Sequence, residues 1–355
     1  MRRQKRCKPA GFLRIACGCL REMLYIPNVN HDPAMNLAME EYILSSSGIR
    51  DQVLFFYVNA PSVIIGRHQN TSDEINAEFV RKQGIQLVRR CSGGGAVYHD
   101  HGNLNYSLIF PGDPKLNGDF SDLLLPILDA LHSLGLPAEL GGRNDLLLNG
   151  LKFSGNAYYH NQFGSVTHGT LLFNSDLDVL SKALQPSYQK LKAKGISSVR
   201  SRVCCIKDAF PNLADTEELK EAILDYFRKE YSITTRSFSE SEFQQIELLA
   251  DKRYRNDAWT YGESPAYTIR RFFHPSCGLI DFRADVREKI IQNIRFFGDF
   301  FCPEEISSLE EALKGTPWQE SDIRDLLLRA HWDSFFPDFS VEMFISGLFS
   351  VKEDV

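Results

Sequence analysis

A loop that contains three consecutive glycines and two arginines is the first stretch whose residue types could do chemistry. It spans residues 89–100 and reads RRCSGGGAVYHD. Glycines let backbone N–H groups approach an anion without interference from Cβ atoms, and arginines bind phosphate through paired N–H groups. The chain has no Gly-Lys pair, which excludes a P-loop, and no GxGxxG, which excludes the usual dinucleotide fingerprint. The loop therefore predicts a nucleotide or adenylate site with a different glycine geometry; the alternative is a plain turn.

A lysine beside a predicted hairpin turn is the second candidate. Lys152 follows Asn149-Gly150, and this dipeptide between two apolar runs is the strongest short-range signal for a two-residue hairpin. Because side chains alternate along a strand, we expect Lys152, Ser154 and Asn156 to share one face. Gly155 would permit close approach of another group. A lysine here could neutralise phosphate charge and polarise a carboxyl group, although a lone strand lysine is more often an exposed, solubilising residue.

The third candidate is a basic segment in an otherwise acidic chain. Between residues 179 and 207 there are seven basic residues and no acidic one: Lys182, Lys190, Lys192, Lys194, Arg200, Arg202 and Lys207. Residues 185–212 are polar and irregular, and long irregular loops in compact proteins are commonly functional. Such a cluster would steer an anionic partner or close over a reactive intermediate as a lid. The alternative is a solvated loop.

The remaining nucleophiles and metal ligands form no recognisable group. The chain has no CxxC pair, no HxxxH pair on a predicted helix and no GxSxG. We therefore predict no protein-bound metal site. Cys91 in the glycine loop could be a nucleophile, but a small residue that fills space is the simpler interpretation. With no export signal, the cysteines predict free thiols and a cytoplasmic location.

The elements that must position these residues do not alternate regularly between strand and helix, which favours an α+β fold over a doubly wound α/β fold. Apolar periodicity predicts helices over residues 34–44, 74–84, 119–135, 176–184, 216–231 and 240–250. Strands are predicted over 53–58, 62–66, 85–88, 96–98, 104–110 and 166–173, with the hairpin over 145–155.

The character of the chain changes after a polar stretch at 251–257, which we expect to be a linker. The following residues predict a three-stranded meander over 267–273, 278–286 and 289–297, and then helices near 303–314, 320–329 and 341–349. We therefore expect a larger domain over 23–250 and a small α+β domain over 258–355.

Composition excludes several classes of protein. The chain has 355 residues, and its 43% hydrophobic and 24% charged residues are ordinary for a globular protein of two or three domains. No apolar run is long enough to span a membrane, and a net charge of −6 argues against general nucleic-acid binding. Residues 1–22, by contrast, carry seven basic side chains and one acidic one. We expect them to lie outside any domain, either as an upstream stretch read in frame before a start at Met23 or as a targeting segment.

Six motifs, in order, resemble those of the lipoate–protein ligase A family. They are GRHQN at 66–70, RRCSGGGAVYHD at 89–100, GRNDL at 142–146, KFSGNA at 152–157, HGTL at 168–171 and KGISSVRSRV at 194–203. The stretch WTYG at 259–262 resembles the entrance to that family's accessory domain. The resemblance runs from about Met23 to the C-terminus. Thr71-Ser72 departs from it, because the family often has Pro-Trp there, and this leaves the part played by Arg67 open.

This resemblance implies a fold shared with biotin ligases, in which helices cover a mixed sheet, followed by a small α+β C-terminal accessory domain. It implies a two-step reaction: lipoate and ATP give lipoyl-adenylate and pyrophosphate, and an acceptor lysine then takes the lipoyl group. The implied acceptors are the lipoyl domains of 2-oxoacid dehydrogenase complexes and the glycine cleavage H protein. Mg²⁺ is expected to accompany ATP, and neither nucleic acid nor a membrane is an expected partner.

The resemblance also implies which residues form the site. The positions similar to the family's ATP-binding residues are Arg90, Gly95, Ala96, Val97 and Tyr98. Lys152 is similar to the lysine that contacts both nucleotide and lipoate, which makes it the catalytic and lipoate-binding candidate. Apolar residues 63–65 and 87–88 are candidates for a slot that takes the lipoate tail.

The basic segment is expected to divide its work between two anionic groups. We expect Lys194, Arg200 and Arg202 to act on the nucleotide or adenylate, and Lys190 and Lys192 to act on an acidic acceptor. Three alternatives to a ligase remain: an ATP-independent lipoyl or octanoyl transferase with an essential cysteine, a biotin ligase, and a lipoate-binding protein without activity.

Overall fold

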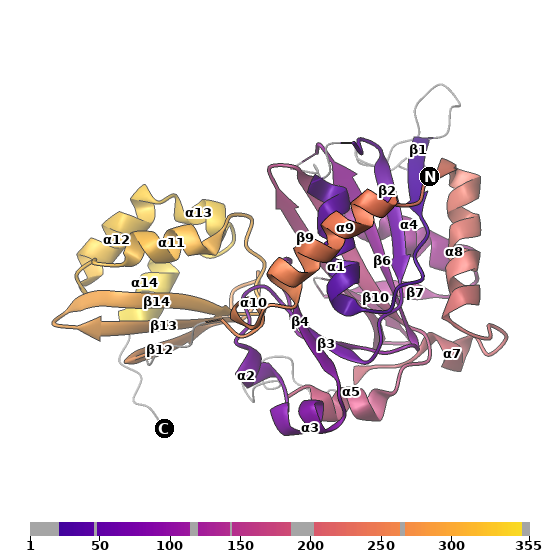
Figure 1. Ribbon diagram of the computed structural model, residues 1–355. Coiled ribbons are helices and arrows are strands. Elements are labelled where there is room, and N and C mark those ends of the chain that lie inside the picture. Colours follow the sequence, from indigo (N-terminus) through magenta and orange to yellow (C-terminus); the bar gives the residue numbers. More distant parts are fainter. Residues whose placement is uncertain are drawn as a thin grey trace, which may run out of the picture.

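The computed structural model describes residues 21–45, 48–113, 120–142, 144–185, 202–262 and 267–349. These ranges contain a large mixed sheet with helices on both faces, a small second sheet, and a C-terminal sheet packed on helices (Figure 1). The arrangement confirms the predicted α+β class. None of the described helices is long and apolar enough to cross a membrane.

Eight strands form the large sheet, with its parallel pairs at one edge. Their order is β11 (Tyr231–Thr235), β1 (Arg21–Ile26), β2 (Gln52–Tyr57), β6 (Asn103–Pro111), β10 (Gly164–Leu172), β9 (Leu151–Asn161), β8 (Asp145–Leu148) and β7 (Ala138–Gly141). β1 is parallel to β11 and β2, and every other neighbouring pair is antiparallel. The two edge strands, β11 and β7, were not predicted, because both are short and largely exposed.

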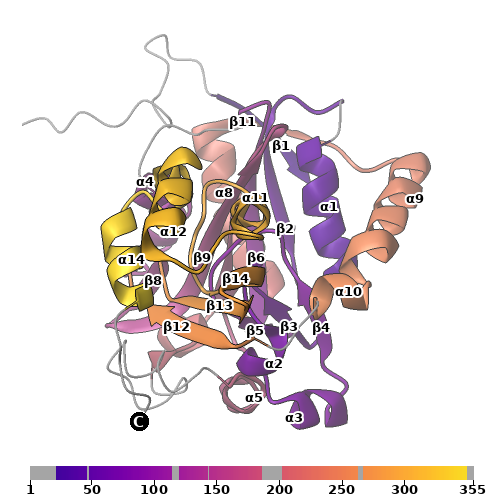
Figure 2. The same ribbon diagram turned by 90° about the vertical axis from the view of Figure 1, so that its left-hand side faces the viewer.

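Both faces of the large sheet are covered, so its central strands β6 and β10 are buried along their whole length. In β2, Val53 and Phe55 face a core that includes α1 (Pro33–Ser45), α9 (Glu240–Leu249) and the π-helical turn η2 (Ala250–Tyr254). Leu54 and Phe56 face the opposite core, which includes α4 (Phe120–Ser133) and α8 (Thr216–Glu230). Figure 2 shows these two helical layers with the strands between them. Because side chains alternate along the strand, β2 contributes to two separate cores.

Three short strands form the second sheet, in the order β4 (Gln86–Arg89), β3 (Ser62–Ile65) and β5 (Val97–His99). Its core packs on α3 (Ala77–Lys82) and α5 (Leu177–Ala183). The helix predicted over 74–84 begins later, at Ala77, because the Asn76 side chain caps α3 by accepting from the N–H of Phe79. A separate helical turn, α2 (Thr71–Glu74), precedes it. The glycine loop joins β4 to β5, so both of its ends are held against β3.

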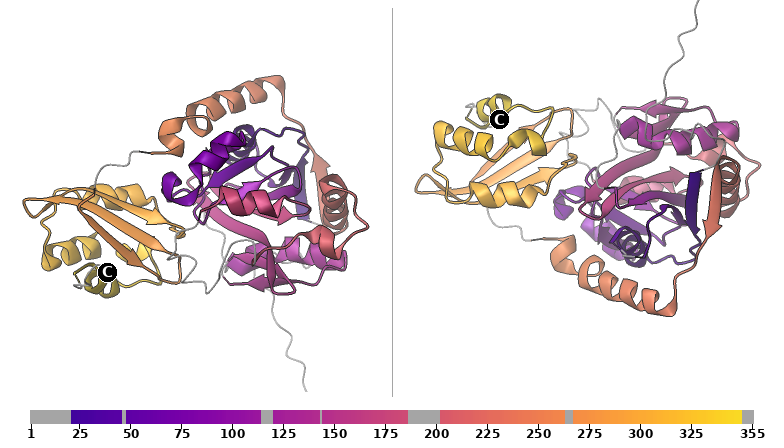
Figure 3. Two further views of the ribbon diagram at one scale, coloured as in Figure 1. Left: turned by 90° about the horizontal axis from the view of Figure 1, so that it is seen from below. Right: turned by 90° about the horizontal axis from the view of Figure 1, so that it is seen from above.

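The C-terminal unit is an antiparallel meander covered by helices, as predicted. Its elements are β12 (Ile269–Phe273), β13 (Ile280–Arg287), β14 (Ile290–Gly298), α11 (Ile306–Leu313), α12 (Glu320–Arg329), α13 (Trp332–Phe335) and α14 (Val341–Phe349). Aromatic rings fill its core: the ring centroids of Trp332 and Phe344 lie 4.7 Å apart, and those of Phe282 and Phe296 lie 5.3 Å apart. Figure 3 shows this unit beside the larger one.

The stretch predicted to be a polar linker is helical and partly buried. Residues 250–254 form η2, α10 (Asp257–Thr260) follows, and Tyr254 is 2% exposed. Arg255 pairs with Asp32, Glu247 and Asp251 at 2.5–2.6 Å. The polarity of this stretch therefore reflects ion pairing and not an extended linker.

Two predictions fall partly outside the described residues. The basic extension over 1–22 is described only at Arg21 and Glu22, which open β1 and pair with β11. Of the irregular segment over 185–212, residues 186–201 lie outside the described ranges, and α7 (Ile206–Ala209) follows them.

Candidate active site

A cavity of about 210 Å³ lies between the glycine loop, the β8–β9 hairpin and β10. Its wall contains all six residues predicted to bind nucleotide or lipoate: Arg90, Gly95, Ala96, Val97, Tyr98 and Lys152. These residues come from two segments that are far apart in the sequence. The fold therefore brings the two main candidate motifs to one site.

Lys152 lies near the start of β9 and forms an ion pair with a buried carboxylate. Its Nζ lies 2.7 Å from Oδ1 of Asp145 on β8, and Arg202 binds the other oxygen of the same carboxylate. Asp145 is 6% exposed, and a buried charge of this kind requires compensation. Lys152 and Arg202 both line the cavity. The site thus presents two positive groups that are held by one buried negative group.

The turn before Lys152 has the predicted conformation, because Asn149 and Gly150 both have positive φ, 52° and 79°. The strand that follows departs from the prediction. Phe153 is the extra residue of a β-bulge, and the bulge reverses the alternation of side chains. Gly155, and not Ser154, therefore shares the face of Lys152.

The close approach of Lys152 to Gly155 confirms this change of face. A Cβ at Gly155 would lie 2.8 Å from Nζ of Lys152. Ser154 is fully buried. The predicted grouping of Lys152 with Ser154 and Asn156 is wrong, because an alternating pattern does not reveal a bulge.

Arg90 lines the cavity but gives its N–H groups to the glycine loop itself. Its Nε donates to Ser92 Oγ at 3.0 Å, and its Nη2 donates to the carbonyl oxygens of Gly93 at 2.6 Å and Gly95 at 2.9 Å. Burial lowers the pKa of Arg90 from 12.5 to about 10, so the side chain remains cationic at neutral pH. Arg90 shapes the loop, and its contact with ATP stays a prediction.

Arg89 is absent from the cavity wall, which corrects the expectation that both loop arginines meet phosphate. Its guanidinium donates to the carbonyl oxygens of Gly66 and Gln69 at 2.7 Å, of Trp259 at 2.9 Å and of Thr260 at 2.7 Å. The indole Nε1 of Trp259 donates in return to the carbonyl oxygen of Arg89 at 2.8 Å. Arg89 therefore ties the small sheet to α10, and its donors are used by backbone carbonyl oxygens and by the Thr71 hydroxyl.

Residues between β14 and α11 complete one side of the cavity. Asp299 and Phe301 line it, although no sequence pattern pointed to them. Phe300 is fully buried, and its ring stacks on that of His68 with 4.7 Å between centroids. A Cβ at Gly93 would lie 2.5 Å from the carbonyl oxygen of Phe300, so this contact requires glycine. The C-terminal unit thus contributes directly to the site.

The apolar part of the wall differs from the predicted slot. Of residues 63–65 and 87–88, only Ile64 lines the cavity, and the others pack into the cores of the small sheet and of α1. Further apolar residues of the wall come from several elements: Leu37, Ala157, Leu172, Leu180 and Leu184. This lining suits an aliphatic chain.

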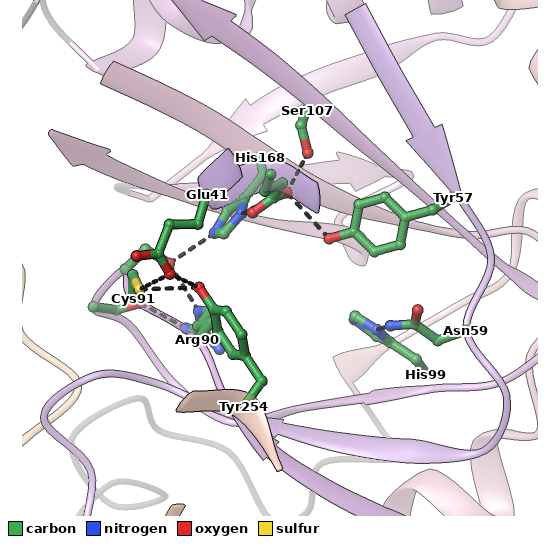
Figure 4. A network of polar contacts seen from close by, with 12 residues as sticks. Glu41, Tyr57, Asn59, Arg90, Cys91, His99, Ser107, His168 and Tyr254 are labelled. Carbon is green, nitrogen blue, oxygen red and sulfur yellow. Dashed lines mark hydrogen bonds and ion pairs between the residues drawn. The ribbon is translucent and has the colours of Figure 1, made fainter. Parts of the chain in front are cut away.

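Behind the glycine loop, polar side chains form a network that the sequence did not indicate (Figure 4). Glu41 accepts a hydrogen bond from Tyr254 at 2.7 Å and pairs with Arg253 at 2.8 Å. Cys91 Sγ lies 3.2 Å from the Tyr254 hydroxyl. Burial raises the pKa of Cys91 to about 11, which keeps it a thiol at neutral pH. The geometry therefore gives no support to Cys91 as a nucleophile.

Family models match most of the chain. Residues 32–228 match the lipoyl protein ligase A/B catalytic domain, and residues 264–348 match the bacterial lipoate protein ligase C-terminus. Lipoate-protein ligase LplJ of Bacillus subtilis is 38% identical over 336 residues, which are 92% of this chain and 100% of LplJ. Lipoate–protein ligase 1 of Staphylococcus aureus is 39% identical over 317 residues, which are 89% of this chain and 97% of that protein.

Solved structures of similar proteins extend these matches. LipL1 of P. falciparum, in complex with lipoate, has a TM-score of 0.72 at 25% identity and covers 87% of this chain and 94% of its own. A bi-partite lipoate protein ligase from Thermoplasma acidophilum, described with its E2 lipoyl domain, has a TM-score of 0.58 at 30% identity, with coverage of 70% and 100%. A lipoate-protein ligase A bound with ATP has a TM-score of 0.56 at 28% identity, with coverage of 69% and 99%.

Proposed function

This chain belongs to the family of the lipoyl protein ligase A/B catalytic domain, and we propose that it is an ATP-dependent lipoate–protein ligase. In the first step the enzyme activates lipoate as lipoyl-AMP. In the second step it transfers the lipoyl group to a lysine of an acceptor domain. Curated relatives at 38% and 39% identity carry this name, and similar solved proteins hold lipoate or ATP.

The observation that carries the proposal is the pair of cations beside the glycine loop. Lys152 and Arg202 share the carboxylate of Asp145 at the cavity wall. In adenylation, a carboxylate oxygen of lipoate attacks the α-phosphorus of ATP, and the bond from that phosphorus to pyrophosphate breaks. Negative charge on the transferring phosphoryl group is stabilised best by donors that are already in place. Lys152 is therefore the proposed catalytic residue, in contact with both nucleotide and lipoate.

The proposed ATP-binding residues are Arg90 and residues 95–98, together with Lys152. Of these residues, Ala96 offers its backbone N–H group from a loop whose shape Arg90 maintains, because Arg90 holds the preceding carbonyl oxygen of Gly95. A concave arrangement of such groups binds phosphate oxygens. In the second step, the acceptor ε-amine attacks the carbonyl carbon of the mixed anhydride, and AMP leaves with the bonding electrons.

Mg²⁺ is proposed to arrive with ATP. Within the described ranges, no three His, Cys, Asp or Glu side chains gather to hold a metal ion. The cavity wall does contain the carboxylates of Glu74 and Asp299, besides that of Asp145, whose two oxygens bind Lys152 and Arg202. Mg²⁺ is commonly held by one or two carboxylates and by substrate phosphates, and this donor set fits that mode. The ion would neutralise phosphate charge.

The proposed acceptors are lipoyl domains of 2-oxoacid dehydrogenase complexes and the glycine cleavage H protein. The archaeal ligase cited above is described with its own E2 lipoyl domain, which supports an acceptor of this kind. A cytoplasmic location is part of the proposal, because the described cysteines are free thiols and the reaction needs ATP.

An ATP-independent transferase on the same fold would need a cysteine at the reacting carbonyl. None of the five described cysteines lines the large cavity. Burial raises the pKa of Cys205 to about 11 and of Cys302 to about 12, which suppresses their thiolate forms. These observations favour the ligase.

The proposal is tested with purified protein, lipoate, ATP and Mg²⁺. A ligase should exchange labelled pyrophosphate into ATP only when lipoate is present, and it should add one lipoyl group to a lipoyl domain, as measured by mass spectrometry. Transfer from octanoyl-acyl carrier protein in the absence of ATP, without lipoate-dependent exchange, would show that the transferase is correct.

A further inference from the structure

Four buried side chains form a hydrogen-bonded chain, and three of them, Glu40, His168 and Ser92, have no role in the proposed reaction. Glu40 lies on α1, His168 on β10, and Ser92 and Arg90 on the glycine loop, and each is at most 8% exposed. His168 Nδ1 lies 2.9 Å from Oε2 of Glu40, and its Nε2 lies 2.7 Å from Ser92 Oγ. Figure 4 shows His168 between the hydroxyls of Tyr57 and Ser107 on one side and the glycine loop on the other. The hydrogen-bonded chain therefore links α1 and β10 to the glycine loop.

The partners of Glu40 set the direction of the bonds at one end. The hydroxyls of Tyr57, at 3.2 Å, and of Ser107 both donate to Oε1 of Glu40. Burial, and then the charge of Glu40, raise the pKa of Tyr57 well above its usual value of 10, so the phenol keeps its proton. The carboxylate thus acts as the acceptor, and His168 Nδ1 carries the proton that it shares with Glu40.

Arg90 sets the direction of the hydrogen bonds at the Ser92 end of the chain. A guanidinium can only donate, so Ser92 Oγ accepts from Nε of Arg90 at 3.0 Å. Within the described residues the other hydrogen-bond partner of Ser92 Oγ is Nε2 of His168, so we assign the single proton of Ser92 to that nitrogen. These directions give a neutral imidazole of His168 with its proton on Nδ1.

The order serine, histidine, carboxylate is also that of a hydrolase triad. Ser92 differs from a nucleophile in two respects. It is 1% exposed and is absent from the wall of the large cavity, and its oxygen accepts a bond from a cation. We propose that the Glu40–His168–Ser92 chain is a positioning device that fixes Arg90 and thereby the direction of the glycine-loop N–H groups during adenylation. This inference rests on the proposed ligase function.

Trans peptide geometry explains how Arg90 directs the loop. Arg90 holds the carbonyl oxygens of Gly93 and Gly95, and the described chain has no cis peptide bond. In a trans peptide unit the C=O and the following N–H point in opposite directions. The N–H groups of Gly94 and Ala96 therefore point away from Arg90. Within the described ranges neither makes a hydrogen bond, and both residues line the cavity.

The links act in series, so the loss of one should remove what the others contribute. Ser92→Ala breaks the chain next to Arg90. Glu40→Gln keeps the shape of the side chain but adds an amide donor where Tyr57, Ser107 and His168 all donate. We expect each variant to lower the kcat of lipoate-dependent pyrophosphate exchange by about 10- to 100-fold, the range expected when reacting groups are slightly misplaced.

A double-mutant cycle distinguishes two substitutions that break the same hydrogen-bonded chain from two substitutions that act independently. The double variant Ser92→Ala, Glu40→Gln should be no slower than the slower single variant, whereas independent effects would multiply. Thr167→Val is the matched control, because Thr167 is a buried β10 neighbour of His168 whose hydroxyl makes no hydrogen bond within the described residues. We expect near-normal exchange from this control, and the double variant Thr167→Val, Ser92→Ala should exchange as slowly as Ser92→Ala alone.

A measurement on the unmodified protein covers the case in which a variant fails to fold. Nitrogen-15 NMR of histidine-labelled protein, with His168 identified by the signal lost in His168→Asn, should show a neutral ring protonated at Nδ1. A ring protonated at Nε2 would overturn the inference, as would unchanged exchange in folded Ser92→Ala and Glu40→Gln or purely multiplicative effects. Covalent labelling of Ser92 by a fluorophosphonate would identify a nucleophile instead. Absence of exchange in the unmodified protein would refute the ligase function. The NMR result would still test the hydrogen-bonded chain Glu40–His168–Ser92.

Discussion

Replacing Lys152 by alanine should nearly abolish adenylation while the fold persists. The substitution removes an ammonium group that lies 2.7 Å from Asp145 on the cavity wall. A preorganised donor that acts mainly in the transition state lowers the activation free energy by about 3–4 kcal/mol, or raises the rate about 10²–10³-fold. Lys152→Met separates charge from volume, because methionine keeps most of the side chain. Both variants should be impaired to a similar degree.

The effect of Lys152→Ala on stability should be small, for a reason that the site makes clear. Asp145 keeps Arg202 as a partner, and the Lys152 side chain is 23% exposed. A partly exposed ion pair contributes up to about 1 kcal/mol, which corresponds to a Tm shift of at most about 2–4 °C, the range for a domain of about 150–250 residues. Loss of both cations would leave the buried carboxylate of Asp145 without an ion-pair partner and should lower the free energy of unfolding by about 3–5 kcal/mol. The double variant Lys152→Ala, Arg202→Ala should therefore melt far earlier than either single variant.

The assay is lipoate-dependent exchange of labelled pyrophosphate into ATP, with a thermal melt of every variant. Lys229→Ala is the control, because Lys229 is an exposed lysine of α8 outside the cavity wall. Near-normal exchange in folded Lys152→Ala would refute the assignment of Lys152. Equal melting of the single and double variants would refute the compensation of Asp145 by two cations.

Three further predictions concern the same protein. Gly155→Ala should lower the exchange rate about tenfold with little change in Tm, because the added Cβ would lie 2.8 Å from the movable ammonium of Lys152. A normal rate would show that the Lys152 ammonium can be displaced without loss of activity. A protein that begins at Met23 should keep full activity and a Tm within about 2 °C, because only two described residues are removed, at the start of β1, where they pair with the edge strand β11; a larger fall would show that residues 1–22 pack on the fold. Charge reversal at Lys190 and Lys192, which lie outside the described residues, should raise the acceptor KM at low salt and leave the ATP KM alone; an unchanged acceptor KM would contradict this role.

Local physical preferences allowed much of this protein to be predicted from its sequence. The turn at Asn149-Gly150 needs positive φ at both positions, and few other dipeptides accept it, so the hairpin could be located without a structure. The meander and its helices followed from apolar periodicity in the same way. The glycine loop and Lys152 were recognisable because their residue types are suited to binding phosphate. Their meeting at one cavity was a prediction from family resemblance.

Only the tertiary structure decided how the side chains of the site are used. The bulge at Phe153 depends on pairing with β8, and no alternation in β9 reveals it. Arg89 and Arg90 are neighbours of the same type, yet one binds the backbone of α10 and the other binds the glycine loop. Asp299 and Phe301 reach the cavity only because the C-terminal unit packs against the loop. Hydrogen bonds and packing join residues that are distant in sequence, so their partners are set by the fold and not by local pattern.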